Sequence, residues 1–541
     1  MTGTAAVPTT AVRTKGPGDE LAGTGALLRL ALRRDRVLIP VWAIALGGLV
    51  ASGAGTLEKV YTTGAQRADV ARSMSGNGSL RALYGPVFGD SPGALTAWRF
   101  GGFGCVLAAV MSLLIVVRHT REEEETGRQE LLSSAMVGRR APLTSALLAA
   151  FVANAAVASI VTAGLAKSTG NTAGSAALGL TIGAIGMLFA AMAAIMAQLT
   201  ESARLAKGLT GAVLGAAFLL RAAGDTATRD ASSVLDHLSP LGWAENVRPY
   251  AGERWWLLLL VVATALAQGA VAYVLAGRRD IGMSFVPPRP GPAEGRITSA
   301  YGLAWRLQRG GVLGWAVGFA LAGLLFGRMA DGAAALVGDN ARTREIIQRM
   351  GGQSGLTDAF LATMVGMLGM VAALYAVASV LRLHGEETGG RAEPVLAASV
   401  GRVRWAAGHL VIAFGGAALI MTVGGLGLAA GHGGDAGPLL GAALVQLPAI
   451  WTLSGLAVLL YGAFPRLAQG ALGVVSLCLA LGWIGPALNL PAAVLDVSPF
   501  GHLPKLPGAG MAWPPVLLLT ALAAVLTGAG VGALRRRDVV G

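Results

Sequence analysis

A run of four carboxylates, Glu122 to Glu125, is followed closely by Gly127, Arg128, Glu130 and Leu131. Carboxylates beside a guanidinium can pair with a charged partner, hold a metal ion or move protons. If the run begins a helix, its negative charge complements the positive end of the helix dipole. Glycine permits a break after it, and the leucine adds an apolar contact. The stretch therefore has the composition of a docking surface.

The same pattern occurs a second time in the chain. Glu386, Glu387, Gly390, Arg391 and Glu393 each stand 263 positions after Glu123, Glu124, Gly127, Arg128 and Glu130. The second copy is less regular, because Ala392 and Pro394 interrupt it. For one copy, a solvated loop with internal ion pairs would be an equal explanation. Two matching copies favour a surface that docks on a soluble partner.

Metal and nucleotide chemistry have weaker support in the sequence. His119 precedes Glu122 and Glu123 at helical spacing, and His384 precedes Glu387 in the same way, but so few ligands make a thin metal site. The glycine-rich stretch at 351–355 superficially resembles an ATPase signature, yet the sequence contains no G-x-x-x-x-G-K-[ST] phosphate loop. We therefore expect no metal, no bound cofactor and no ATP hydrolysis by this chain.

The composition predicts a membrane protein. Hydrophobic residues make up 54% of the 541 residues, charged residues only 13%, and the mean hydropathy is +0.62, whereas soluble domains are about a quarter charged. The net charge of +13 is spread over many short loops, and no basic tract carries interleaved aromatic residues, so we expect no nucleic-acid partner. Cys105 and Cys478 lie far apart in apolar stretches and are expected to be packing residues.

Twelve apolar stretches of about 18 residues or more predict twelve transmembrane helices. They cover approximately residues 37–56, 100–117, 143–166, 176–199, 205–220, 255–276, 311–327, 359–381, 405–430, 438–460, 468–484 and 513–534. The segment 27–36 mixes leucine and arginine at helical spacing, which predicts a short helix at the membrane surface. The segment 303–309 resembles it. The fold class is therefore an all-α polytopic membrane protein.

The twelve stretches divide into two sets of six with matching landmarks. Arg278-Arg279-Asp280 follows the sixth stretch as Arg536-Arg537-Asp538 follows the twelfth, and Trp42 matches Trp315. We interpret the chain as a tail at 1–23, a first half at 24–280, a proline- and glycine-rich linker at 281–298 and a second half at 299–541. This predicts a tandem duplication of six-helix halves, related by a pseudo-twofold axis along the membrane normal.

Lysine and arginine set the expected orientation. They are more numerous on the side that carries both termini, the linker and the two charged stretches, although the opposite segments at 57–99, 221–254 and 328–358 also contain arginines. We therefore expect both termini and both charged stretches in the cytoplasm.

The stretch from Arg121 to Leu132 resembles the loop after the second span of ATP-binding-cassette type-2 export permeases. In that family it forms a coupling helix on the cytoplasmic ATPase. The fused twelve-span form is similar to actinobacterial permeases for polyketide antibiotics of the tetronasin type. The resemblance implies a permease subunit in the bacterial plasma membrane and two copies of a separate ATPase, which carry the ATP and magnesium. It also implies a hydrophobic or amphiphilic cargo that is antibiotic- or drug-like.

Two other classes of function stay open. An ion-coupled secondary transporter usually carries a carboxylate within the membrane, and the predicted spans contain almost no ionisable residue. A polytopic membrane enzyme would need a catalytic cluster at the interface, for which the acidic stretches are the only candidates. In a docking surface, charge reversal of Glu123 and Glu124, or of Glu386 and Glu387, is expected to lower transport and leave the membrane fold intact.

Overall fold

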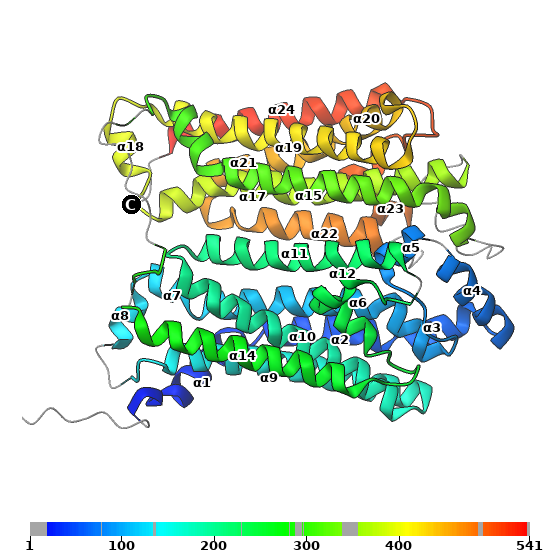
Figure 1. Cartoon of the computed structure of the whole chain (residues 1–541). Helices are drawn as coiled ribbons and strands as arrows, with labels where there is room; N and C mark the ends of the chain where they lie inside the picture. Colours follow the sequence, from blue (N-terminus) through cyan, green and yellow to red (C-terminus); the bar gives the residue numbers. More distant parts are fainter. Residues whose placement is uncertain are drawn as a thin grey trace, which may run out of the picture. The chain divides into compact units, whose positions relative to one another are not determined.

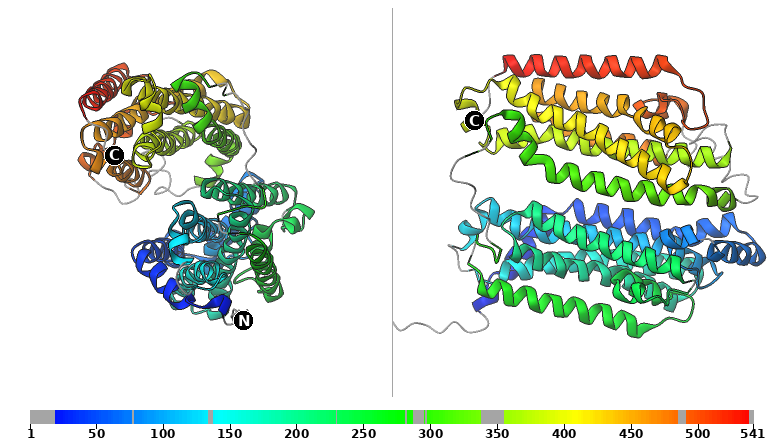
Figure 2. Two further views of the ribbon diagram at one scale, coloured as in Figure 1. Left: turned by 90° about the vertical axis from the view of Figure 1, so that its left-hand side faces the viewer. Right: turned by 45° about the horizontal axis from the view of Figure 1, so that its top comes forward.

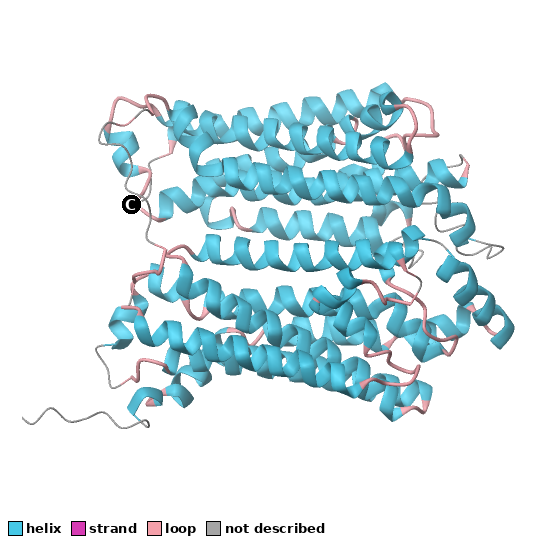
Figure 3. Cartoon of the chain, viewed as in Figure 1, coloured by secondary structure: helices cyan, strands magenta, loops and turns pink. Residues whose placement is uncertain are grey.

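The computed structural model describes residues 19–76, 78–133, 137–228, 230–280, 282–286, 295, 297–337, 355–484 and 491–537. Across these ranges every regular element is a helix (Figure 3). Twelve of the helices in the described ranges are long and apolar enough to cross a membrane. The predicted all-α polytopic class is therefore confirmed. The chain divides into two compact units, unit 1 at Met1–Pro290 and unit 2 at Gly291–Gly541.

Unit 1 is built around α10, which packs against α6, α9, α11 and α14. Its long helices are α2 (Leu38–Ala51, continued by α3 at Gly53–Val60), α6 (Pro92–Arg118), α9 (Ala141–Thr169), α10 (Thr172–Leu199), α11 (Ala203–Ala227) and α14 (Trp255–Arg278) (Figure 1). Small side chains let these backbones approach closely. A Cβ on Gly186 of α10 would lie 1.9 Å from Oδ1 of Asn154 on α9. That asparagine is buried, and its amide donates to Ser112 Oγ on α6 at 2.8 Å.

The long helices of unit 2 are α15 (Ala300–Val337), α17 (Leu356–Thr388), α19 (Arg402–His432), α20 (Ala436–Leu444) with α21 (Leu447–Ala463), α22 (Gly470–Ile484) and α24 (Trp513–Arg536). Within each unit the long helices run alongside one another (Figure 2). Glycines bring α15 and α19 together, because a Cβ on Gly327 would lie 2.2 Å from Leu428 O and one on Gly431 would lie 2.2 Å from Leu324 O. A larger residue at either position would force the two helices apart.

Short helices join the long ones. Unit 1 has α1 (Thr24–Arg34), α4 (Gly64–Gly76), α5 (Gly78–Tyr84), α7 (Arg121–Glu125), α8 (Arg128–Ser133), α12 (Val234–Leu238) and α13 (Pro240–Asn246), and unit 2 has α18 (Glu393–Ala397) and α23 (Ala492–Leu495). Single 3₁₀ turns lie at Asp19–Leu21, Pro465–Leu467 and Pro499–His502. Residues 1–18, most of the predicted linker, the glycine-rich stretch at 351–354 and Asp538 lie outside the described residues.

The structure corrects three sequence predictions. A separate short helix is confirmed for unit 1 as α1, but the segment 303–309 is part of the continuous helix α15. Pro40, in the first turn of α2, blocks helix continuation because it lacks an N–H and clashes with the preceding turn, and 299–320 contains no proline. The span predicted at 438–460 is one of the twelve candidate spans, at Ala436–Ala463, but two helices, α20 and α21, build it, with Pro448 at the start of α21. Helix α11 continues to Ala227, past the predicted end at 220.

Candidate functional site

The first charged stretch folds into two short helices, α7 and α8, separated by Gly127. This glycine has φ of +70°, a left-handed conformation that strains other L-residues. Its N–H donates to Glu124 O at 3.0 Å, which closes α7. The predicted break at Gly127 is therefore confirmed. Leu131 lies within α8, and its side chain is outside the described part of the structure.

Glu124 joins α7 to the end of the last helix of unit 1. Its two carboxylate oxygens accept from Nη1 and Nη2 of Arg279 at 2.7 and 2.6 Å, and Arg121 pairs with one of them as well. Arg279 Nε also donates to Gln198 Oε1, at the end of α10, at 2.9 Å. The Glu124 and Arg279 side chains are only 6% and 8% exposed. This bidentate pair is therefore buried and geometrically strong.

The other three carboxylates of α7 each reach a different element. Glu122 pairs with Lys207 of α11, and Glu123 pairs with Arg34 of α1. Glu125 Oε1 accepts the backbone N–H of Ala203 at 2.6 Å, so it satisfies one of the free N–H groups at the start of α11. Together these contacts fix α7 against α1, α11 and α14. The acids of α7 therefore mostly make contacts within unit 1.

In unit 2 the two acids stand on a long helix. Glu386 and Glu387 lie in the last turns of α17, so no short helix like α7 forms there. Glu387 accepts from Arg537 Nη2 at 2.9 and 2.7 Å and from the Tyr461 hydroxyl at 2.5 Å, and its side chain is 4% exposed. Glu386 Oε2 accepts from Arg391 Nε at 2.8 Å.

Contacts of the two charged stretches recur at matching positions. Gly127 and Gly390 both have positive φ, at +70° and +67°, and their N–H groups donate to Glu124 O and Glu387 O, both at 3.0 Å. Three further pairs of contacts correspond. Glu123–Arg128 matches Glu386–Arg391, and Glu124–Arg279 matches Glu387–Arg537. The guanidinium of Arg139 donates to Arg279 O as that of Arg402 donates to Arg537 O. We call Glu124–Arg279 and Glu387–Arg537 the two clamps.

The sequence-predicted residues therefore separate into two groups. Glu124, Glu386 and Glu387 are turned inward, where charge reversal would leave buried ions unpaired, so the expectation that such variants keep the fold intact does not fit the structure. The second group faces solvent. It comprises Glu125, Arg128 and Glu130 in unit 1, and Gly390, Arg391 and Glu393 in unit 2. This second group is the most accessible to a partner, while Glu122, Glu123 and Gly127 are partly exposed.

The histidines near the charged stretches have other contacts. His119 Nε2 lies 2.6 Å from Oδ2 of the buried Asp35, which also pairs with Arg118 at 2.7 Å. The His384 ring packs against Tyr461 with ring centroids 6.3 Å apart. Among the described residues, no group of three or more His, Cys, Asp or Glu side chains is arranged to hold a metal ion.

Comparison of the sequence with known proteins shows the family of this chain. Residues 297–535 match the family described as the C-terminal domain of the multidrug efflux system permease Rv1217c. Over 532 residues the chain is 44% identical to the multidrug efflux system permease protein Rv1217c of Mycobacterium tuberculosis, and the alignment covers 96% of each chain. The chain belongs to this permease family. Membership agrees with a multi-pass membrane protein that serves as a transport subunit.

In this member of the permease family, sequence reasoning missed the cationic half of each clamp. Arg279 and Arg537 were visible only as landmarks in the repeated Arg-Arg-Asp triplet, and Tyr461 carried no signal. Sequence reasoning also ended the fifth span at residue 220, so two ionisable residues of α11, Arg221 and Asp225, were left outside the predicted spans. Arg221 and Asp225, four residues apart, are both buried there. The i, i+4 spacing of opposite charges within an apolar helix was the available signal.

Proposed function

We propose that this chain is the permease subunit of an ATP-binding-cassette exporter, which moves hydrophobic or amphiphilic drug-like compounds outward and takes its energy from a separate ATPase. The relative with 44% identity is a multidrug efflux system permease, which supports export of drug-like cargo. The observation that carries the proposal is the clamp found in both units, each behind an exposed charged stretch.

The clamps explain how movement at a docking surface would reach the membrane helices. Arg128 and Glu130 on one stretch, and Arg391 and Glu393 on the other, face solvent and can pair with a soluble ATPase. Directly behind them the clamps attach α7 to the end of α14 and α17 to the end of α24. Because a buried, hydrogen-bonded ion pair resists separation, a displaced docking stretch carries the end of its last helix with it.

Two docking stretches imply two ATPase copies. The matching contacts of the two stretches support a tandem duplication, with one six-helix half in each unit and a pseudo-twofold axis between the halves. ATP and magnesium then belong to the ATPase. The same arrangement requires both docking stretches, and with them both termini, to lie in the cytoplasm of a bacterial cell. The cargo would be of the antibiotic type, as in the similar polyketide exporter permeases.

One observation favours a second candidate, an ion-coupled secondary transporter. Arg221 and Asp225 of α11 lie beside Glu245 of α13, and all three side chains are at least nine-tenths buried. Buried carboxylates in a transporter are often proton or cation sites. This group occurs in unit 1, whereas the clamps occur in both units, so it fits a ligand site better than a shared energy source.

Co-purification with a candidate ATP-binding-cassette ATPase from the same organism tests the proposal. We expect the combined variant Arg128→Glu, Glu130→Lys and Glu393→Lys to lose most of the ATPase. As a matched control, Asp69→Lys with Arg72→Glu reverses an exposed pair on α4, whose side chains are 69% and 77% exposed. This control should retain the ATPase. Equal recovery of the ATPase by both variants would refute docking through the charged stretches.

A further inference from the structure

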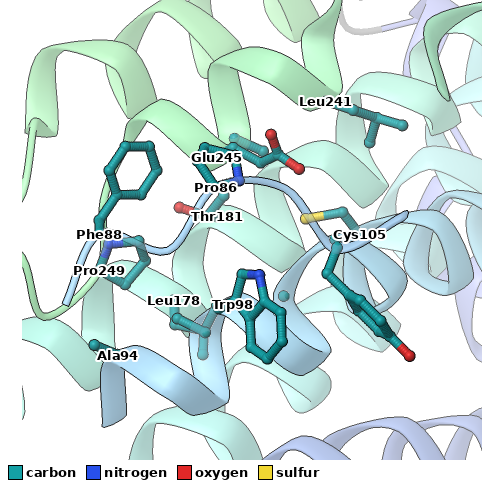
Figure 4. A pocket seen from close by; sticks show the side chains of 15 residues that line it. Pro86, Phe88, Ala94, Trp98, Cys105, Leu178, Thr181, Leu241, Glu245 and Pro249 are labelled. Carbon is teal, nitrogen blue, oxygen red and sulfur yellow. The ribbon is translucent and has the colours of Figure 1, made fainter. Parts of the chain in front are cut away.

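Unit 1 contains a cavity between α6, α10, α13 and the segment 84–88, at the end of α6 opposite α7 (Figure 4). The cavity volume open to the centres of water molecules is about 50 Å³. One water molecule needs roughly 10–15 Å³ by this measure, so the cavity has room for several. The lining includes three aromatic residues, Tyr84, Phe88 and Trp98, and one carboxylate, Glu245. In Figure 4 the Glu245 carboxylate and the Cys105 thiol lie away from Phe88, which is at the other end of the pocket.

The Glu245 carboxyl group lies at the cavity wall and is paired on its inner side. Its side chain is 10% exposed, and Oε1 accepts from Nη1 of Arg221. Oε2 accepts from no N–H or hydroxyl donor among the described atoms, but the carboxyl groups of Glu245 and Asp225 hydrogen-bond to each other. A Cβ on Gly85 would lie 2.6 Å from Oε1, and Gly85 has φ of +86°. The glycine therefore leaves the space in which this carboxylate sits at the cavity wall.

Carboxylates outnumber the guanidinium that reaches them behind this wall. Asp225 Oδ2 is 3.5 Å from Arg221 Nη1, and the Asp225 carboxyl group hydrogen-bonds to that of Glu245. The Asp236 carboxylate is buried and accepts from the backbone of Ser233. Arg81 points its guanidinium at backbone oxygens, including Asp225 O at 2.9 Å. One cation thus faces three buried acids. Burial raises the pKa of Glu245 in spite of Arg221, and burial also raises the pKa of Asp236.

The aromatic residues of the cavity already accept cations on their faces. Arg99 lies 4.5 Å from the centroid of the Tyr84 ring, and Arg248 lies 4.2 Å from that of Phe88. Trp98 is held in place by a hydrogen bond from Nε1 to Gly85 O at 2.9 Å. No cation–π contact with Trp98 is found in the described structure. Trp98 is also the ring type that binds cations most strongly.

We propose that this cavity binds an organic ammonium group. The positively charged nitrogen would contact the Glu245 carboxylate, and the carbon atoms next to it would contact the Trp98 ring. The cavity is too small for a whole drug-like molecule, so it would hold the cationic head of an amphiphilic compound. The inference deepens the proposed export function, on which its biological meaning rests, by naming cationic amphiphiles as a cargo class. A second cation is attracted to this wall because a single guanidinium, that of Arg221, is shared among three acidic side chains in a poorly solvated place.

Ligand-observed NMR titration of benzylammonium against the purified full chain in lipid nanodiscs tests this site. Benzyl alcohol is the probe of matched size without the charge. We expect saturable binding of benzylammonium that is at least tenfold tighter than that of benzyl alcohol. Glu245→Gln, whose amide oxygen can still accept from Arg221, should weaken benzylammonium about tenfold or more, and Trp98→Leu about threefold. Glu58→Gln, an exposed acid on α3, is the matched control and should change nothing.

Thermal unfolding of each variant shows that the fold is retained before binding is compared. Equal affinity for the two probes, equal binding by Glu245→Gln and the native chain, or an absence of saturable binding would each overturn the proposal. The last result would mean that only protons or water occupy the cavity. The titration involves neither ATPase nor transport, so its failure would leave the export proposal standing. Failed co-purification would in turn leave a measured ammonium site unaffected.

Discussion

Neutralising Glu387 tests the unit 2 clamp most severely. Its carboxylate accepts from Arg537 at 2.9 and 2.7 Å and from Tyr461 at 2.5 Å, and its side chain is 4% exposed against 15% for Arg537. Removing one partner of a buried ion pair destabilises by about 3–5 kcal/mol, because the remaining charge stays buried without a counter-ion. We therefore expect Glu387→Gln to lower the free energy of unfolding of the chain by about 3–5 kcal/mol.

The assay is equilibrium unfolding of the purified chain in mixed micelles of rising denaturing-detergent content. Glu393→Gln makes the same chemical change at an exposed position close by, and should shift the free energy by about 0.5 kcal/mol or less. A double-mutant cycle with Arg537→Met should give a coupling energy of about 1–3 kcal/mol, since each residue loses the same contact. A loss below about 1 kcal/mol for Glu387→Gln, or a coupling energy near zero, would refute the clamp as a strong mechanical connection.

Three further predictions concern the glycine turns of the charged stretches and the buried acids of unit 1. Gly127→Ala and Gly390→Ala, at φ of +70° and +67°, should each destabilise by roughly 1–2 kcal/mol in the detergent assay, and no change would contradict the left-handed turns. Gly224→Ala would place a Cβ 2.0 Å from Asp236 Oδ1, so we expect about 1–3 kcal/mol of destabilisation and weaker benzylammonium binding; unaltered binding would separate the acids from the cavity. Because the pKa of Glu245 is raised from its ordinary 4.5 in the folded state, its contribution to stability is full below that value and is lost as the pH rises through the folded pKa. Unfolding measured from pH 4 to 8 should therefore show a steeper fall in stability for the native chain than for Glu245→Gln, and parallel curves would contradict the shift.

Hydrophobic patterning was sufficient to predict the class of fold and the number of membrane-spanning helices. Long apolar runs leave few alternatives to a helix in lipid, because each backbone polar group must be satisfied within the segment. The patterning could not decide whether a charged stretch interrupts a helix. Helix α17 runs through Glu386 and Glu387 to Thr388, whereas α6 ends at Arg118 before α7 begins. That difference depends on tertiary contacts of individual side chains.

The candidate site was located from the sequence, but its internal contacts were not. The repeat identified Glu124 and Glu387 as notable without showing that they are buried. Their partners, Arg279 and Arg537, lie more than a hundred residues further along the chain, and only packing brings each pair together. Packing also brings together Arg221 and Glu245, which are 24 residues apart on α11 and α13. Such ion pairs depend on how the helices pack, and neither hydropathy nor local residue spacing predicts which helices pack against each other.

Reconstituted transport tests the main claim most directly. The purified chain, with and without the ATPase identified by co-purification, is placed in proteoliposomes that contain a fluorescent cationic amphiphile. We predict ATP-dependent export only when the ATPase is present, with strong loss in the Arg128→Glu, Glu130→Lys and Glu393→Lys variant. Export by the chain alone, driven by a proton or sodium gradient in the absence of ATP, would contradict the account.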